Sequence, residues 1–213
     1  MHDYQREFID FAIRNEVLRF GDFKLKSGRI SPYFFNSGFF NSGASIARLG
    51  RYYAETIVRA NPLFDVLFGP AYKGIPLAVA TAVAIAEHHG RDIPYAFNRK
   101  ETKDHGEGGN IVGAALLGRV LIIDDVISAG ISVAESIQLI HSAGGIPAGV
   151  VVALDRQERS NGSLSAIEEV EQRHGIPVLS IITLDQIMSC ITDMNGMNDT
   201  LVRVRAYRDQ YGV

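Results

Sequence analysis

Five almost continuously apolar runs in the last two thirds of the chain limit its fold more than any other feature. They lie at residues 65–68, 94–98, 120–124, 148–154 and 178–183. Segments with helical patterns separate them, at residues 75–88, 132–143 and 164–174. Apolar strands that alternate with helices are typical of a parallel sheet with helices on both faces. We therefore predict an α/β protein with a doubly wound, mostly parallel sheet flanked by helices.

The first 64 residues have a different pattern. Apolar residues at helical spacing predict an amphipathic helix over residues 4–17, and a second helix is expected over residues 45–60. Between them, residues 23–36 contain Ser27-Gly28 and Ser31-Pro32 and are expected to form short extended pieces joined by turns. A chain of 213 residues with 46% hydrophobic content fits one domain, with a small hood mainly from residues 1–40.

Charge and cysteine content exclude several classes of protein. A formal net charge of -3 and a pI near 6.1 argue against a nucleic-acid or membrane-surface partner. Charges interrupt the apolar residues of positions 1–20, so we expect neither a signal peptide nor a membrane span. Cys190 is the only cysteine, which excludes an internal disulfide and thiolate zinc sites. These features predict a soluble, cytoplasmic protein.

The run at 120–124 ends in two carboxylates, Asp124 and Asp125, and is followed by a loop of small residues and a helix. Ligands gather at the carboxyl ends of parallel strands, where the amides of a helix N-terminus can bind phosphate. Ser128 and Gly130 are small enough to let a phosphate approach, and the two acids can accept hydrogen bonds from sugar hydroxyls or approach magnesium. This pairing suits a ribose phosphate. The alternative is an ordinary loop with a serine helix cap.

A second turn follows the first apolar run. Gly69 and Gly74 flank a segment that contains Lys73, and such a turn before a helix can present amides and an ammonium group to a diphosphate. The alternative is a simple strand-to-helix connection with a solvated lysine.

Residues 100–113 are polar and rich in glycine, and we expect them to form a flexible lid because they cannot bury enough apolar area to order themselves. This segment and its edge contain four possible cations, Arg99, Lys100, Lys103 and His105. Positive charge that closes over a site can stabilise a departing pyrophosphate. The alternative is a solvated surface loop.

Taken whole, the string from Val120 to Ser132 resembles the signature of type I phosphoribosyltransferases that binds phosphoribosyl pyrophosphate (PRPP). Ser128-Ala129-Gly130-Ile131 stands where that family usually has Thr-Ala-Gly-Thr, so Ile131 lacks a hydroxyl. The hood segment, residues 23–36, resembles that of orotate phosphoribosyltransferases, bacterial enzymes of pyrimidine biosynthesis, and the similarity extends over nearly the whole chain.

This resemblance implies a glycosyltransferase that moves the ribose 5-phosphate of PRPP to N1 of orotate. The products are orotidine 5′-monophosphate and pyrophosphate, on the route to UMP. It further implies Mg²⁺ held mainly by PRPP and water, without a metal site built by the protein. It also implies a homodimer with active sites shared across subunits, in which the lid serves the neighbouring subunit.

The resemblance implies a role for individual residues as well. The implied catalytic residues are Lys103, His105, Asp124 and Asp125. The implied PRPP-binding residues are these four together with Lys26, Tyr72, Lys73, Arg99, Lys100, Val126, Ile127, Ser128, Ala129, Gly130, Ile131 and Ser132. The implied orotate-binding residues are Lys26, Phe34, Phe35, Ser128 and Arg156. The family commonly has a cis peptide that does not precede proline, expected here within residues 71–73.

Several alternatives stay open at this point. Arg156 could form a surface pair with Asp155 or Glu158 in place of binding the orotate carboxylate, and a strand with alternating faces would bury only one of Phe34 and Phe35. A purine or uracil phosphoribosyltransferase would share the PRPP loop, but the hood and Arg156 argue against it. A PRPP-sensing transcriptional regulator would need a DNA-binding module, and the N-terminal segment has no basic helix-turn-helix.

Overall fold

The computed structural model describes residues 1–25, 27–103, 109–128, 130–160 and 162–213, and only the backbone of residues 102, 103 and 109. Its helices are α1 (Asp3–Arg14), η1 (Ser37–Phe39), α2 (Gly43–Ala60), α3 (Gly74–His89), α4 (Ile131–Ser142), α5 (Ala166–His174), α6 (Leu184–Thr192) and α7 (Asn198–Tyr211). Its strands are β1 (Leu18–Lys24), β2 (Ile30–Phe35), β3 (Val66–Gly69), β4 (Tyr95–Lys103), β5 (Gly109–Gly113), β6 (Arg119–Ile123), β7 (Ile146–Asp155) and β8 (Val178–Thr183).

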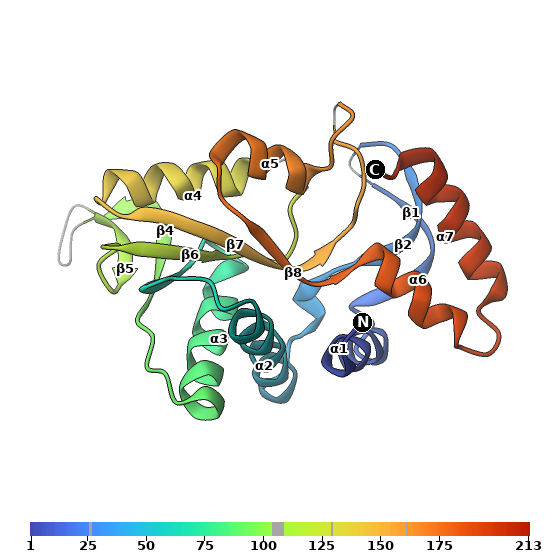
Figure 1. The fold of residues 1–213 in the computed structure, drawn as a ribbon, viewed down its shortest axis with the longest axis horizontal. Coiled ribbons are helices and arrows are strands. Elements are labelled where there is room, and N and C mark those ends of the chain that lie inside the picture. Colours follow the sequence, from blue (N-terminus) through green and yellow to red (C-terminus); the bar gives the residue numbers. More distant parts are fainter. Residues whose placement is uncertain (26, 104–108, 129, 161) are drawn as a thin grey trace.

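The central sheet has the strand order β5-β4-β3-β6-β7-β8 (Figure 1). All of its neighbouring strands pair in parallel except β4 and β5, which are antiparallel. The helices α4 and α5 lie on one side of the sheet, and α2 and α3 lie on the other (Figure 1). The predicted fold class is confirmed, and each predicted apolar run corresponds to one strand of this sheet.

Alternating side chains of the central strands pack on opposite faces of the sheet. In β6, Val120 and Ile122 belong to the core under α4 and α5, whereas Leu121 and Ile123 belong to the core under α2 and α3. All four are at most 1% exposed. Burying an aliphatic side chain of this size stabilises the fold by about 1.5–3 kcal/mol. The strands are therefore apolar throughout because both faces are covered.

The hood consists of β1 and β2, which pair antiparallel from Leu18 opposite Phe35 to Lys24 opposite Ile30. The helix α1 ends at Arg14, three residues earlier than predicted, because the chain turns through Glu16 at φ 57° and enters β1. Buried side chains of the hood belong to the same core as buried side chains of the sheet face under α2 and α3. The hood is thus part of the main core.

Two strands extend into residues 100–113. Residues 100–103 belong to β4 and residues 109–113 form β5, with Lys103 opposite Gly109 and Asn98 opposite Ile111. Strand pairing satisfies backbone hydrogen-bonding groups whatever the side chains are, so these polar residues extend the sheet. These strands were not expected from the sequence. Residues 104–108 lie outside those that the structure describes, and the flexible lid over residues 100–113 stays a prediction.

Two helices, α6 and α7, have no counterpart among the predicted elements. Thr183 and Gln186 form a capping box at the start of α6, a signal that is readable from sequence. In α7, Leu201, Val204 and Tyr207 are buried at intervals of three residues between charged positions. Cys190 is a buried free thiol in α6. Within the described ranges, no helix combines the length and the apolar character needed to cross a membrane.

Candidate active site

Asp124 and Asp125 follow β6 in the middle of the sheet, and both are buried at 8% and 7% exposure. Asp124 Oδ1 accepts a hydrogen bond from the Asp125 amide at 2.9 Å, and Oδ2 accepts one from the Ser132 hydroxyl at 3.0 Å. Burial, and then the charge of Asp125, raise the pKa of Asp124 from 3.8 to about 6. Burying two neighbouring carboxylates costs free energy of folding, so their presence indicates a site that binds a ligand.

Asp125 joins the two predicted loops. Its Oδ2 accepts hydrogen bonds from Lys73 Nζ at 2.6 Å and from the Ser37 hydroxyl at 2.8 Å, and its Oδ1 accepts one from the Val126 amide at 2.9 Å. The lysine side chain is 54% exposed. The turn after β3 and the loop after β6 therefore meet at the same edge of the sheet. Ser37 belongs to this cluster and was not identified from the sequence.

The turn between β3 and α3 is built on two glycines that admit no side chain. A Cβ on Gly69 would lie 2.0 Å from the carbonyl oxygen of Gly74, and one on Gly74 would lie 2.9 Å from the carbonyl oxygen of Ile123. The peptide bond from Ala71 to Tyr72 is cis, as expected within residues 71–73. The Ala71 amide donates to Asn98 Oδ1 at 2.8 Å, so Asn98 on β4 holds this turn.

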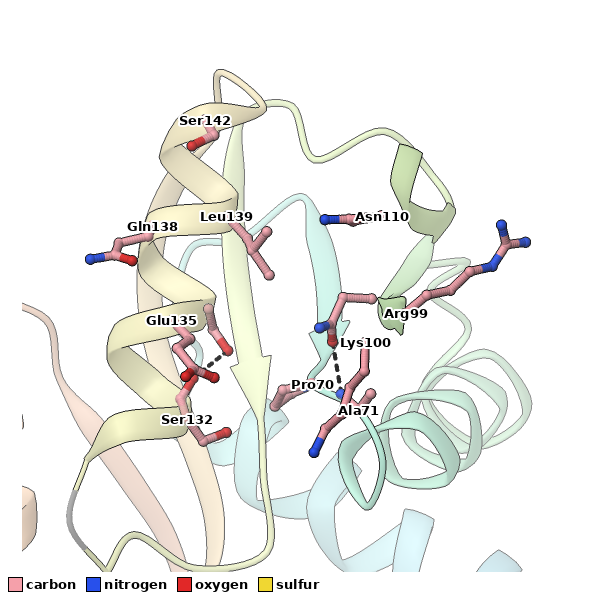
Figure 2. A pocket seen from close by; sticks show the side chains of 12 residues that line it. Pro70, Ala71, Arg99, Lys100, Asn110, Ser132, Glu135, Gln138, Leu139 and Ser142 are labelled. Atoms are coloured by element: carbon pink, nitrogen blue, oxygen red, sulfur yellow. Dashed lines mark hydrogen bonds between the residues drawn. The ribbon is translucent and has the colours of Figure 1, made fainter. Parts of the chain in front are cut away.

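A cavity of about 570 Å³ lies beside this turn, between α4 and the β4–β5 hairpin (Figure 2). Its lining residues are Pro70, Ala71, Asn98, Arg99, Lys100, Asn110, Ser132, Glu135, Ser136, Gln138, Leu139 and Ser142. Lys100 extends toward Ala71, and its Nζ lies 5.0 Å from the ring centroid of Tyr72. The guanidinium of Arg99, the preceding residue, points away from α4 (Figure 2). The two cations thus line one cavity with side chains that point in different directions.

The loop after Asp125 offers mainly its backbone to a ligand. The Ile127 side chain is 7% exposed in the core, and Val126 packs against the opposite core. Gly130 has φ 68°, a conformation that favours glycine, and precedes the first turn of α4. The Ser128 side chain is exposed, and that of Ile131 is 65% exposed.

In the hood, Phe34 and Phe35 point to opposite faces of β2. The Phe34 ring stacks on the Phe23 ring, with centroids 5.4 Å apart and planes at 24°. The Phe35 side chain is 7% exposed and belongs to the main core. Any contact from Phe35 to a ligand must therefore come from its backbone. The guanidinium of Arg19 lies 5.8 Å from the Phe34 ring centroid, a neighbour that sequence reasoning missed.

Arg156 follows β7 at the same edge of the sheet as Asp124. Its side chain is only 17% exposed. Its Nε and Nη2 donate to Glu158 Oε1 at 3.1 and 2.7 Å, and its guanidinium lies 4.6 Å from the Tyr33 ring centroid. The alternative pairing with Glu158 is therefore present, but it is a buried pair, and it connects Arg156 to the hood.

Some predicted site residues cannot be placed. Lys26, His105 and Ala129 lie outside the described residues, and only the backbone of Lys103 is described, at the end of β4. In the part of the chain that the structure describes, no three His, Cys, Asp or Glu side chains form a metal-binding group. The oxygens of Asp124 and Asp125 are nevertheless suitable partners for a water shell around Mg²⁺, which usually keeps several waters.

Comparisons with known proteins agree with this arrangement. The family model described as the phosphoribosyl transferase domain matches residues 39–165. Orotate phosphoribosyltransferases of Pseudomonas fluorescens (strain SBW25) and Thioalkalivibrio sulfidiphilus are 62% and 58% identical, over the whole of both chains. The crystal structure of orotate phosphoribosyltransferase from Francisella tularensis matches with a TM-score of 0.89 and 43% identity, over 97% of this chain and 100% of that one. The chain therefore belongs to the orotate phosphoribosyltransferases, a family within the phosphoribosyl transferase domain proteins.

Proposed function

We propose that this chain transfers the ribose 5-phosphate of PRPP to N1 of orotate and releases orotidine 5′-monophosphate and pyrophosphate. The observation that carries the proposal is the contact of Lys73 with Asp125, since it brings a diphosphate-type turn to a ribose-phosphate loop. The names of the full-length relatives support the same reaction. Its product belongs to the route to UMP.

In the proposed mechanism, N1 of orotate forms a bond to the anomeric carbon of PRPP, and the proton of N1 is released to solvent water. The bond from that carbon to the pyrophosphate oxygen breaks, and the electron pair leaves with pyrophosphate. No protein nucleophile is required, so the chain contributes orientation and charge stabilisation. The first amides of α4 bind the 5-phosphate, Asp124 and Asp125 accept hydrogen bonds from the ribose hydroxyls, and Lys73 faces the pyrophosphate.

Magnesium and the lid complete the proposal. Mg²⁺ neutralises charge on the PRPP oxygens when bound, and the two aspartates can accept hydrogen bonds from its water ligands. Lys103 and His105 act from the lid on the leaving group. We further propose a cytoplasmic homodimer in which this lid serves the partner subunit.

The raised pKa of Asp124 predicts a pH dependence of PRPP binding. Because its pKa in the folded protein is about 6, above the usual 3.8, Asp124 takes up a proton as the pH falls through 6. The KM for PRPP should therefore rise between about pH 7.5 and about pH 5, and Asp124→Asn should flatten that rise. The free energy of unfolding should increase as the pH falls, although binding of PRPP weakens. The contribution of Asp124 to this free energy is fully present below pH 3.8 and is lost as the pH rises through about 6. An identical KM profile in the variant would contradict the assignment.

Arg156→Leu tests recognition of the orotate carboxylate. The KM for orotate should rise about 10- to 100-fold, while the KM for PRPP should stay within about two-fold, because only orotate loses a charged partner. Arg119→Leu is the matched control, since Arg119 pairs with Asp65 before β3, at the other end of the strands. Equal increases in both KM values of Arg156→Leu would assign the residue to folding or phosphate binding.

The reaction itself is tested with purified protein, PRPP and Mg²⁺. Orotate should be converted to orotidine 5′-monophosphate, whereas uracil, adenine and hypoxanthine should give no comparable product. Preferred turnover of any of these three bases would overturn the proposed function.

A further inference from the structure

The buried carboxylate of Glu158 connects three parts of the molecule. Its Oε1 accepts hydrogen bonds from Arg156 Nε and Nη2 and from the Tyr33 hydroxyl at 2.6 Å. Its Oε2 accepts one from the Tyr207 hydroxyl at 3.2 Å. The Glu158 side chain is 11% exposed. One carboxylate thus joins the loop after β7, strand β2 of the hood and helix α7.

The way in which Arg156 uses its donors leaves one edge for a ligand. A guanidinium has five N–H donors arranged on a plane. The edge formed by Nε and Nη2 faces Glu158, and the edge formed by Nη1 and Nη2 has no acceptor among the described residues. Two donors on one edge match the two oxygens of a carboxylate.

We propose that Glu158 is a positioning residue for orotate recognition, because it fixes the guanidinium of Arg156 with its second edge available to the substrate carboxylate. This inference rests on the proposed function. Glu158 does not touch the substrate itself. It acts by limiting the rotation of a long side chain before binding, which reduces the entropy lost when the substrate binds.

The partners of Glu158 are themselves held in place. The Tyr33 side chain is completely buried, and its ring lies under the Arg156 guanidinium. Burial raises the pKa of the Tyr33 and Tyr207 hydroxyls, so both keep their protons and act as donors. The loop that carries Glu158 is tied to the end of the chain, since the Arg159 amide donates to the Tyr211 carbonyl at 2.8 Å. The hood and α7 therefore determine where Arg156 lies.

Steady-state kinetics of Glu158→Ala, Glu158→Gln and Tyr207→Phe test the inference. Glu158→Ala should raise the KM for orotate about ten-fold or more and leave the KM for PRPP within about two-fold. Glu158→Gln keeps one acceptor oxygen and should give an intermediate KM for orotate. Tyr207→Phe removes one donor and should raise it about two- to three-fold. Glu55→Ala, which breaks an ion pair with Arg59 on α2, is the matched control.

The inhibition constant of uracil distinguishes a positioning role of Glu158 from a purely structural role. It lacks the carboxylate of orotate, so its inhibition constant should be the same in the variants and in the unchanged protein. If the KM for orotate stays unchanged in Glu158→Gln and Tyr207→Phe, or if orotate, uracil and PRPP all weaken together, the inference is overturned. These two variants decide the question if Glu158→Ala does not fold. Failure of the unchanged protein to use orotate would instead refute the proposed function.

Discussion

Lys103→Ala is expected to reduce kcat about 100- to 1,000-fold with little change in thermal stability. Lys103 is the last residue of β4, at the end of the hairpin beside the cavity. A cation that meets pyrophosphate as it leaves stabilises the transition state more than the bound substrate, so the loss should appear in kcat. Turnover under saturating PRPP and orotate, together with the melting temperature, measures both effects.

Arg51→Ala provides a control for this variant, because Arg51 is an exposed cation on α2. It should leave kcat within about two-fold of the unchanged protein. If Lys103→Ala retained full turnover, or if its melting temperature fell in proportion to its activity, a role at the leaving group would be refuted.

Mixing subunits extends this prediction to the proposed dimer. Subunits with Lys103→Ala are combined with subunits that carry both Asp124→Asn and Asp125→Asn. If the lid serves the partner subunit, one site of a mixed dimer receives both lesions and the other receives neither, so activity should rise above that of either parent. Verified mixed dimers without recovered activity would show that the lid acts within its own chain.

The double variant Asp124→Asn, Asp125→Asn is expected to lower kcat/KM for PRPP about 100-fold or more. Each hydrogen bond to a charged group contributes about 1.5–3 kcal/mol, and about 1.4 kcal/mol corresponds to a factor of ten. Folding should persist because asparagine can still accept hydrogen bonds from Ser132 and Lys73, which bind the two acids in the structure. Kinetics at varied PRPP and a thermal melt measure the two quantities.

Asp65→Asn is the matched control, since Asp65 also pairs with a cation, Arg119, but at the opposite end of the sheet, where β3 and β6 begin. It should change kcat/KM for PRPP by less than about two-fold. Near-normal kinetics of the double variant would remove both aspartates from PRPP binding.

The sequence was sufficient to predict the central sheet. Each strand that is buried on both faces is an apolar run, and alternation of such runs with helical segments is typical of a parallel sheet. Strand β5 was missed because Gly109, Asn110 and Gly113 give no strand signal, and backbone pairing with β4 decides their structure. Helix α7 was missed because charged residues surround its three buried side chains, and packing rather than local propensity stabilises it.

The site was predictable where it follows strand ends. Asp124 comes directly after one strand and Lys73 follows another after a short turn, so the topology of a parallel sheet brings the two loops together. The supporting residues were not predictable, because nothing local indicates that Ser37 contacts Asp125 or that Tyr207 contacts Glu158. Phe34 and Phe35 lie on opposite faces of β2, so only one of their rings can enter the core. The pairing register of β1 with β2 determines that this ring is Phe35.

The separation of the site partners along the chain determines when the site can form during folding. Lys73 and Asp125 are 52 residues apart, Ser37 and Asp125 are 88 apart, and Tyr33 and Glu158 are 125 apart. Such contacts form only after large loops have closed, so they belong to late folding steps. Because α7 supplies Tyr207, a chain still being synthesised lacks one support of Arg156 until α7 has left the ribosome. We therefore expect a nascent chain to acquire full orotate binding only after α7 has been synthesised.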